Sequence, residues 1–424
     1  MKRWSSLICL LLAAALLCGC GELLEGEYES VRHHQSGAQH GGEGVPLIQA
    51  TSYDEIYDAL LTMIENGDEF GVIRVSSYDG NVEEDVNRAC MEVSNDSPLG
   101  AWAVYYISST VNRIIAYYDA EISITYKRTP LEIQSVVDVT STGALEGELR
   151  YLMSSYSSGE AIRLPAFILQ FQDVTEMVTE IYYEDPTVAS VLPEVIAAVY
   201  PEEGRTRILD LQLQYPYTAA RLTNMQTMAE SAAEEIAGRA REAEEDGLAL
   251  LQACRELAGT VEYDGEREMN GETGWSREDT AFGALIDGRA TGEGFAMALQ
   301  LICRDLGLES RVVRGRRDSV DHCWNLVKLG EDWYHVDASA FGQDGASQAF
   351  LRGDGEMAGR YWWDTNMYEA CEGPLSYAYF VPGTPAEPGE GETGAEPTEE
   401  PSEPAGEPSP APSGEPGEDG DGTE

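Results

Sequence analysis

The chain has 424 residues, 42% of them hydrophobic, which is enough for two or three domains with ordinary cores. Its formal net charge of −49 gives a surface that repels nucleic acid and anionic lipid head groups, so we expect no nucleic-acid partner. The charge leaves cations and basic partners open, and its plainest role is to keep an exposed protein in solution.

The N-terminus has the pattern of a secretory signal that ends in a lipid attachment site. Lys2 and Arg3 precede an apolar stretch over residues 7–17, which is too short to span a bilayer. The following Leu17-Cys18-Gly19-Cys20 is similar to a lipobox, in which Cys20 would be acylated. We therefore expect residues 1–19 to be a signal peptide and Cys20 to anchor the chain to the outer face of a bacterial cell membrane. A plain secretory signal is the alternative.

Neither a disulfide framework nor a metal site is expected. The cysteines that remain in the mature chain are odd in number, widely spaced and without a CxxC pair: Cys90, Cys254, Cys303, Cys323 and Cys371. Residues 20–50 are rich in Gly, Glu and His and are predicted to be a flexible tether, in which His33, His34 and His40 are not expected to hold a metal. We predict no cofactor.

Residues 51–218 show a weak internal duplication. The first unit is expected to run helix, strand, helix, strand, at 53–64, 70–75, 82–93 and 122–126. The second repeats this order: a helix at 145–155, an extended stretch after it, a helix at 174–183 and a strand at 209–215. Apolar and polar residues alternate in the closing strands, which indicates a sheet with one solvated face. We predict two small tandem α/β modules, with no catalytic constellation in either.

The rest of the chain divides at a change of composition. Residues 219–257 are rich in Ala and Glu without proline, and they predict a helix that connects the modules to a further domain. Residues 383–424 consist mainly of Pro, Gly, Glu, Ser and Thr, with thirteen acids, no base and no aromatic residue. Such a tail buries too little surface to offset chain entropy, so it is predicted to be disordered.

Four blocks between these segments carry the functional signal. In chain order they are 280–296 (TAFGALIDGRATGEGFA), the strand 310–314, 321–325 (DHCWN) and 333–337 (WYHVD). In sequence and order they resemble the bacterial transglutaminase-like family of the papain-like superfamily. The resemblance implies an α+β fold with a papain-like transglutaminase core over residues 219–382, preceded by the two modules and followed by the tail.

The resemblance also implies a set of catalytic roles. In the family, a cysteine at a helix N-terminus is the nucleophile, because the helix dipole favours its thiolate. A histidine takes the proton and a carboxylate orients that histidine. His322 matches the family's base and Asp337 its orienting acid, and the predicted hairpin 326–336 places them on neighbouring strands.

At the nucleophile position the chain departs from the family. Alignment without a gap places Gly292 where the cysteine stands, and glycine has no side chain to form an acyl-enzyme. Thr291 is one residue off, and Cys303 would lie about 16 Å further along the same helix. Cys323 would point to the opposite side of its strand from His322. We predict a pseudoenzyme.

Three hypotheses follow from these residues. In the first, the chain is a membrane-anchored binding module or scaffold whose cleft, with His322, Asp337 and Trp324, takes a peptide or cell-wall glycan without cutting it. In the second, it is an active cysteine peptidase, amidase or acyl-transferase, either because residue 292 is a cysteine in the true gene product or because water is the nucleophile. In the third, the domain is purely structural and these three residues hold strands together.

Overall fold

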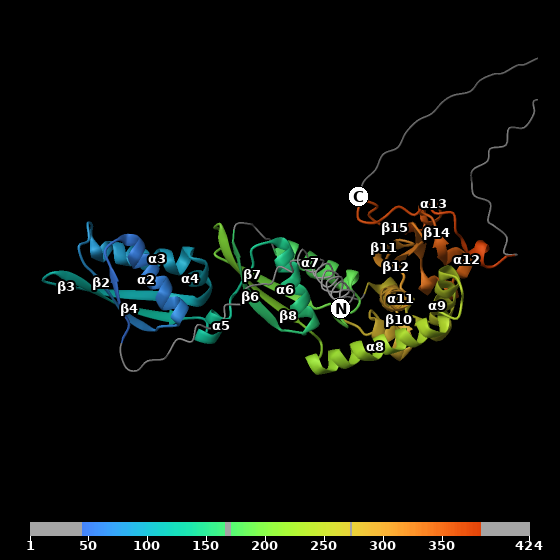
Figure 1. The fold of residues 1–424 in the computed structure, drawn as a ribbon, viewed down its shortest axis with the longest axis horizontal. Coiled ribbons are helices and arrows are strands. Elements are labelled where there is room, and N and C mark those ends of the chain that lie inside the picture. The colour runs from blue at the N-terminus through green and yellow to red at the C-terminus, as the bar shows by residue number, and fades with distance from the viewer. Residues whose placement is uncertain (1–44, 166–170, 272–273, 383–424) are drawn as a thin grey trace, which may run out of the picture. The chain divides into compact units, whose positions relative to one another are not determined.

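The computed structural model describes residues 45–165, 171–271 and 274–382 (Figure 1). The predicted signal peptide, Cys20, the tether histidines His33, His34 and His40, and the predicted disordered tail lie outside the described residues. The described residues belong to one unit that ends at Pro382. Within these ranges, no helix combines the length and the apolar character needed to cross a membrane.

The first module is a four-stranded sheet covered by helices. Its elements are β1 (Leu47–Ala50), α2 (Tyr53–Asn66), β2 (Phe70–Val75), α3 (Val82–Asp96), α4 (Pro98–Ala103), β3 (Val104–Ile114) and β4 (Tyr117–Tyr126). The strand order is β1-β2-β4-β3, with β1 and β2 parallel and the other pairs antiparallel. Side chains of Ser52 and Asn81 cap α2 and α3. Alternate residues of β2 are buried, so one face of the sheet packs on the helices (Figure 1).

The second module has the same strand order and directions. It comprises α5 (Pro130–Gln134), β5 (Val137–Asp138), α6 (Thr142–Ser154), β6 (Gly159–Pro165), α7 (Phe171–Glu184), β7 (Glu194–Tyr200) and β8 (Thr206–Gln214). The order is β5-β6-β8-β7, with one parallel and two antiparallel pairs in the positions found in the first sheet.

The helices and strands expected in this region are present, but four strands were not anticipated. β1 and β5 have four and two residues, too few for a periodic pattern, and β1 lies inside the segment predicted to be a tether. β3 is largely exposed and β7 has no buried residue, so neither sequence shows the apolar alternation of a half-buried strand. The structured region therefore begins by Leu47 rather than at residue 51.

The third region is built around an antiparallel sheet and three helices. The sheet order is β14 (Phe350–Arg352), β13 (Asp332–Val336), β12 (Val320–Leu329), β11 (Ser310–Arg317) and β15 (Tyr361–Trp362). The long helices are α8 (Ala219–Ala240), α9 (Asp246–Thr260) and α11 (Gly292–Leu306). The shorter elements are β9 (Glu262–Tyr263), α10 (Gly265–Asn270), a π-helical turn (Gly283–Asp287), β10 (Arg289–Ala290), a 3₁₀ turn η2 (Ala338–Gly342), α12 (Ala346–Ala349), α13 (Asp354–Met357) and α14 (Tyr377–Phe380).

The single helix expected over residues 219–257 is instead two helices, α8 and α9, broken at 241–245. The two helices contact each other, and each contacts α11. The break has a physical reason, because one straight helix could not lay both halves against α11. Periodicity within each half does not reveal the break.

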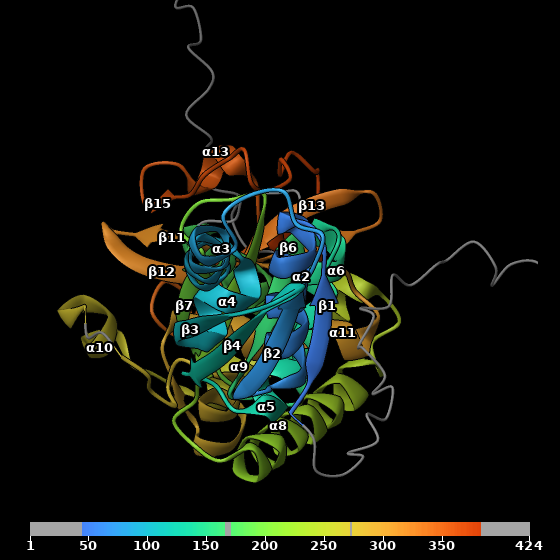
Figure 2. The ribbon, with the colours of Figure 1, turned by 90° about the vertical axis from the view of Figure 1, so that its left-hand side faces the viewer.

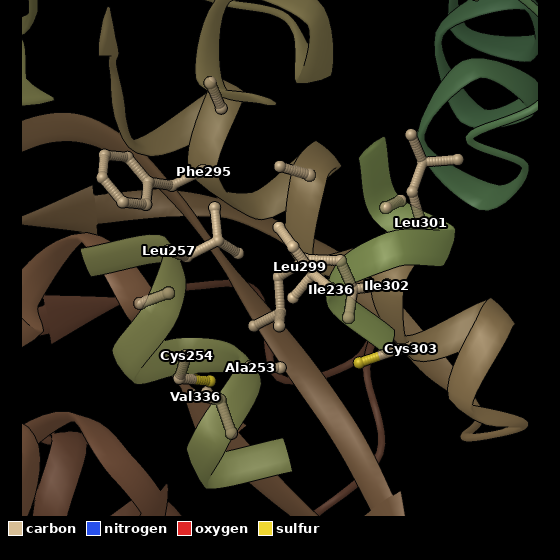
Figure 3. Packing of buried hydrophobic residues seen from close by; sticks show 14 of the residues in the cluster. Ile236, Ala253, Cys254, Leu257, Phe295, Leu299, Leu301, Ile302, Cys303 and Val336 are labelled. Carbon is tan, nitrogen blue, oxygen red and sulfur yellow. The ribbon is translucent and has the colours of Figure 1, made fainter. Parts of the chain in front are cut away.

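The core of this region surrounds α11. Residues 294–303 of α11 are all buried, which is unusual for a helix of a soluble protein and means that it is packed on every side. Leu257 and Cys254 of α9, Ile236 of α8 and Val336 of β13 pack close to it in Figure 3. This packing fixes the position of the first residue of α11, Gly292.

Candidate functional site

The site begins at the N-terminus of α11. Thr291 is extended and precedes the first helical residue, Gly292, but its side chain does not cap the helix. Its hydroxyl donates to Asp279 Oδ1 at 3.0 Å and lies 3.3 Å from the carbonyl oxygen of Glu278. Thr291 is therefore fixed on the side of Asp279, and the backbone N–H of Gly292 is left to another acceptor.

His322 and Asp337 are brought together at the ends of neighbouring strands. His322 lies in β12, and Asp337 directly follows β13. The distance from His322 Nε2 to Asp337 Oδ2 is 2.9 Å. The other carboxylate oxygen of Asp337 accepts from the backbone of Ser339 and Ala340, so it caps η2. The Tyr361 hydroxyl donates to Asp337 Oδ2 at 2.8 Å. Every lone-pair region of Asp337 thus has a donor, which fixes the imidazole it faces.

A residue that the sequence did not single out occupies the other side of His322. The Glu268 carboxylate, from α10, lies with Oε2 3.0 Å from His322 Nδ1. Its Oε1 accepts from the backbone N–H of Gly292. The Tyr263 hydroxyl donates to Oε2 at 2.5 Å. Glu268 therefore stands between His322 and the start of α11.

The charges of this cluster stabilise a protonated imidazole. Burial disfavours the imidazolium, but the carboxylates of Asp337 and Glu268 outweigh it and raise the pKa of His322 to about 9. Burial alone would raise the pKa of Asp337, yet His322 and Arg317 outweigh it and hold that pKa well below its usual range. At neutral pH the arrangement is an imidazolium between two carboxylates.

The cluster is closed to solvent. His322 is 4% exposed and Asp337 2% exposed, and one-tenth of the Glu268 side chain is accessible. A Cβ built on Gly292 would collide with the ring of His322 and lie 2.8 Å from Glu268 Oε1. The space for a side chain at residue 292 is thus already filled.

The other residues weighed as nucleophiles lie elsewhere. Cys303 is fully buried in the core around α11. Cys323 packs against the second module's core, on the opposite side of β12 from His322. Burial raises the pKa of both thiols, to about 12 for Cys303. Neither thiol is brought to His322.

Trp324 has the contacts of a core residue. It is 1% exposed and packs with Tyr361 and Trp363. Its indole N–H donates to His335 Nδ1 at 2.9 Å. The expected ligand-binding role of Trp324 is not supported, because the buried side chain offers almost no surface to a ligand.

One group of side chains has the residue types of a metal site. His335, Asp354 and Cys371 place one ligand atom each within 4.8 Å of one another. However, the indole of Trp324 can only donate, so Nδ1 of His335 accepts and a neutral ring carries its proton on Nε2. That Nε2 faces Asp354 Oδ1 at 2.9 Å, and burial raises the pKa of the Cys371 thiol to about 12. The imidazole Nε2 and the thiol keep their protons, and both ring nitrogens have partners, so the group fits a hydrogen-bonded relay better than a metal.

A cavity lies beside the closed cluster. Glu293, which follows Gly292, lines a cavity of about 470 Å³ between α7, β8 and the segment before α11. Its aromatic walls come from Tyr182, Tyr183, Tyr215 and Trp275. The Tyr183 hydroxyl donates to Glu293 Oε1 at 2.8 Å. Burial and the neighbouring Asp279 raise the pKa of Glu293 to about 7.

Glu268 had no signal in the sequence that separated it from the other acids. It is one of 76 aspartates and glutamates, and it lies 24 residues before Gly292 in a short helix without apolar periodicity. Its position depends on how the segment after β9 folds back, which a local pattern does not encode.

Residues 230–338 match the family model of the transglutaminase-like superfamily. Among solved structures, one described as the crystal structure of a TGase is 14% identical, with a TM-score of 0.26, and the match covers 48% of this chain and 59% of that one. A putative protease from Parabacteroides distasonis is 8% identical, with a TM-score of 0.11, 64% of this chain and 43% of the other being covered. The chain thus spans less than two thirds of either structure, and no curated protein matches.

The family match and the arrangement of α11, β12 and β13 define the class of domain. The chain contains a transglutaminase-like domain, within a mixed α/β structure.

Proposed function

We propose that the chain is a lipid-anchored protein of the outer face of a bacterial cell membrane, whose transglutaminase-like domain binds a ligand without turning it over. The observation that carries the proposal is the pair Gly292 and Glu268: a glycine begins α11, and a carboxylate fills the space beside His322. The lipobox around Cys20 supports the anchor.

The proton balance of the site argues against a mechanism in which His322 activates water. A general base must be neutral to accept a proton, and its pKa is best placed near the working pH. His322, with a pKa of about 9, is already protonated at neutral pH. Both of its ring nitrogens face carboxylates, so it has neither a thiol to activate nor a free nitrogen with which to activate water.

The cavity beside Glu293 supports a binding role. Its volume of about 470 Å³ is in the range of small-molecule sites, and its walls combine aromatic rings with carboxylates. Aromatic faces suit the apolar faces of a peptide or a sugar ring. We expect a cell-wall peptide or glycan to bind there, with the domain acting as a surface receptor or scaffold.

The activity of the purified chain tests the proposal. We expect no incorporation of a fluorescent primary amine into a glutamine-rich protein and no amide hydrolysis above the protein-free control. Treatment with iodoacetamide should change nothing. Turnover by the wild type that His322→Ala abolishes would show an active enzyme instead, and resequencing codon 292 would separate a thiol from a water mechanism.

Restoring the thiol extends this test. We expect Gly292→Cys alone to remain inactive, because its Cβ collides with His322 and Glu268 is still in place. Gly292→Cys combined with Glu268→Ala removes one of the two obstacles, and we expect activity above that of either single variant. Equal activity in the Gly292→Cys single variant and the double variant would contradict a blocking role for Glu268.

A further inference from the structure

Three donors converge on the Glu268 carboxylate. The Gly292 N–H comes from the start of a fifteen-residue helix, the His322 ring from β12 and the Tyr263 hydroxyl from β9. The first helical N–H groups and the helix dipole favour an anion, and an imidazolium strengthens the hydrogen bond. Glu268 is the only one of these groups that belongs to α10. The donors therefore form a carboxylate-binding site on the body of the domain, and its occupant comes from a separate short segment.

α10, the short helix that carries Glu268, makes few buried contacts with the rest of the domain. α10 has six residues, none of them buried, and Met269 is 71% exposed. Gly271 and Gly274 follow it with positive φ angles. Besides Glu268, the helix is held by Arg267, whose guanidinium bonds Asp279 at 2.8 Å, and by its N-cap Asp264, which accepts from the Arg267 N–H at 3.2 Å. Figure 2 shows α10 at the edge of the ribbon. Few buried contacts mean a small free energy of local opening.

We propose that Glu268 is an exchangeable occupant of this site, and that the carboxylate of a peptide ligand replaces it when α10 lifts away. The inference rests on the proposed function, in which the domain binds a ligand without cutting it. It adds that the ligand carries a carboxylate and that this carboxylate takes the place of Glu268. The ligand carboxylate would accept from Gly292 N–H, His322 and Tyr263 as Glu268 does. α10 then acts as a lid that closes the empty site with a carboxylate of its own.

The test is chemical rescue of Glu268→Ala in the full chain. Acetate is titrated while NMR follows the ring of His322, assigned by comparison with His322→Gln. Without acetate we expect the pKa of His322 to fall by roughly one unit or more, because one of its two carboxylates is gone. Acetate should restore it with saturation on the order of millimolar concentration. No saturable shift in the folded variant would overturn the proposal.

Matched variants separate the site from the surface. Glu266→Ala removes an exposed acid from the same helix. We expect this variant to leave the pKa of His322 unchanged and to bind no acetate. Glu268→Gln keeps the shape of the side chain without its charge, so the pKa of His322 should fall while the amide still blocks acetate. Acetate binding by Glu268→Gln as tight as by Glu268→Ala would place acetate elsewhere and contradict the exchange.

Probes of known chemistry define the ligand. N-acetylglycine should bind Glu268→Ala as acetate does, and N-acetylglycinamide, which lacks the carboxylate, should not. The α-amide of N-acetylaspartic acid, whose one remaining carboxylate is that of the side chain, tells a side-chain carboxylate from a chain-terminal one. Equal binding of N-acetylglycinamide would show that the peptide group, not the carboxylate, is recognised and would overturn the proposal.

A measurement on the wild type keeps the proposal testable if Glu268→Ala does not fold. Hydrogen exchange should show the amides of α10 opening far more readily than residues 299–303 of α11, and equal protection would rule out a lid. These results are independent of turnover. Catalysis by the wild type would refute the proposed function alone, whereas an inactive protein without rescue would refute the exchange alone.

Discussion

At the scale of single residues, a glycine and a carboxylate define this site together. The sequence predicted Gly292 at the start of a helix near His322, from ungapped matches on both sides, and the structure has it there. It also predicted that His322 and Asp337 would face each other, because a short hairpin joins their strands. The role of Glu268 could not be predicted, because its contact with His322 spans 54 residues and depends on a turn with no periodic pattern. Local chemistry could be inferred, but not the partner that fills the space.

The raised pKa of His322 predicts a pH-dependent stability. The titratable groups around His322 come from several elements. The carboxylates of Glu268 and Asp337 flank its ring, and the rings of Tyr263 and Tyr361 pack beside it. Arg317 pairs with Asp337. The folded pKa of about 9 lies above the unfolded value of about 6.5, so folding favours the protonated form. This stabilisation, on the order of 3 kcal/mol at most, is complete below about pH 6.5 and is lost as pH rises to about 9.

Melting curves of the wild type and His322→Gln between pH 6 and 9.5 measure this effect. We expect the difference in melting temperature to shrink over that range, while the many exposed acids affect both proteins alike. In the wild type Asp337 stays ionised over this range, since its pKa is held low by His322 and Arg317. A difference that stays constant with pH would show that folding does not shift the pKa of His322.

At the scale of elements, β12 and β13 are joined by more than their backbone ladder. Trp324 of β12 donates to His335 of β13, whose other nitrogen faces Asp354 of α13. The relay links two strands and a short helix through buried polar groups, which stabilise a structure only while each keeps its partner. The sequence predicted a hairpin over 326–336, and these two strands form it, but it could not separate a core tryptophan from a ligand-binding one. Burial, which decides between them, depends on β15 and the residues after it.

Replacement of Trp324 tests this relay. Trp324→Phe leaves the Nδ1 of His335 without its donor and opens a small void, so we expect a loss of about 2 kcal/mol in the free energy of unfolding. Trp362→Phe is the matched control, because Trp362 is 66% exposed and its change should cost little. Chemical denaturation of both variants gives the comparison. Equal stability of the two would mean that the relay adds nothing to the fold.

At the scale of the whole molecule, the two small modules have the same strand order although their sequences show only a faint duplication. The repeat was visible as a recurrence of helix and strand patterns, and the strands it missed were the short or exposed ones. The transglutaminase-like domain was predicted with more detail, because four ordered blocks constrain a fold better than periodicity does. The division of 219–257 into α8 and α9 depended on packing against α11, which no local pattern expresses.

The proposed anchor is tested on the whole protein. We expect the wild type, expressed in a bacterium that processes lipoproteins, to fractionate with membranes and to take up labelled palmitate. Cys20→Ser should abolish both, because an acylated cysteine supplies the buried methylenes that hold the chain at the bilayer. Cys18→Ser should change neither, since residue 18 would be removed with the signal peptide. Membrane retention of Cys20→Ser would show that something other than the acyl group attaches the protein.

Under the proposed function, the crowding at the N-terminus of α11 makes a return to catalysis difficult. One nucleotide change turns a glycine codon into a cysteine codon, yet the new sulfur would arrive in a space that an imidazole and a carboxylate already fill. A lineage returning to enzymatic activity would therefore have to change residue 268 first or at the same time, and the first step alone brings no turnover. The geometry therefore favours the inactive form, because a return to activity needs two changes and the first gives no benefit by itself.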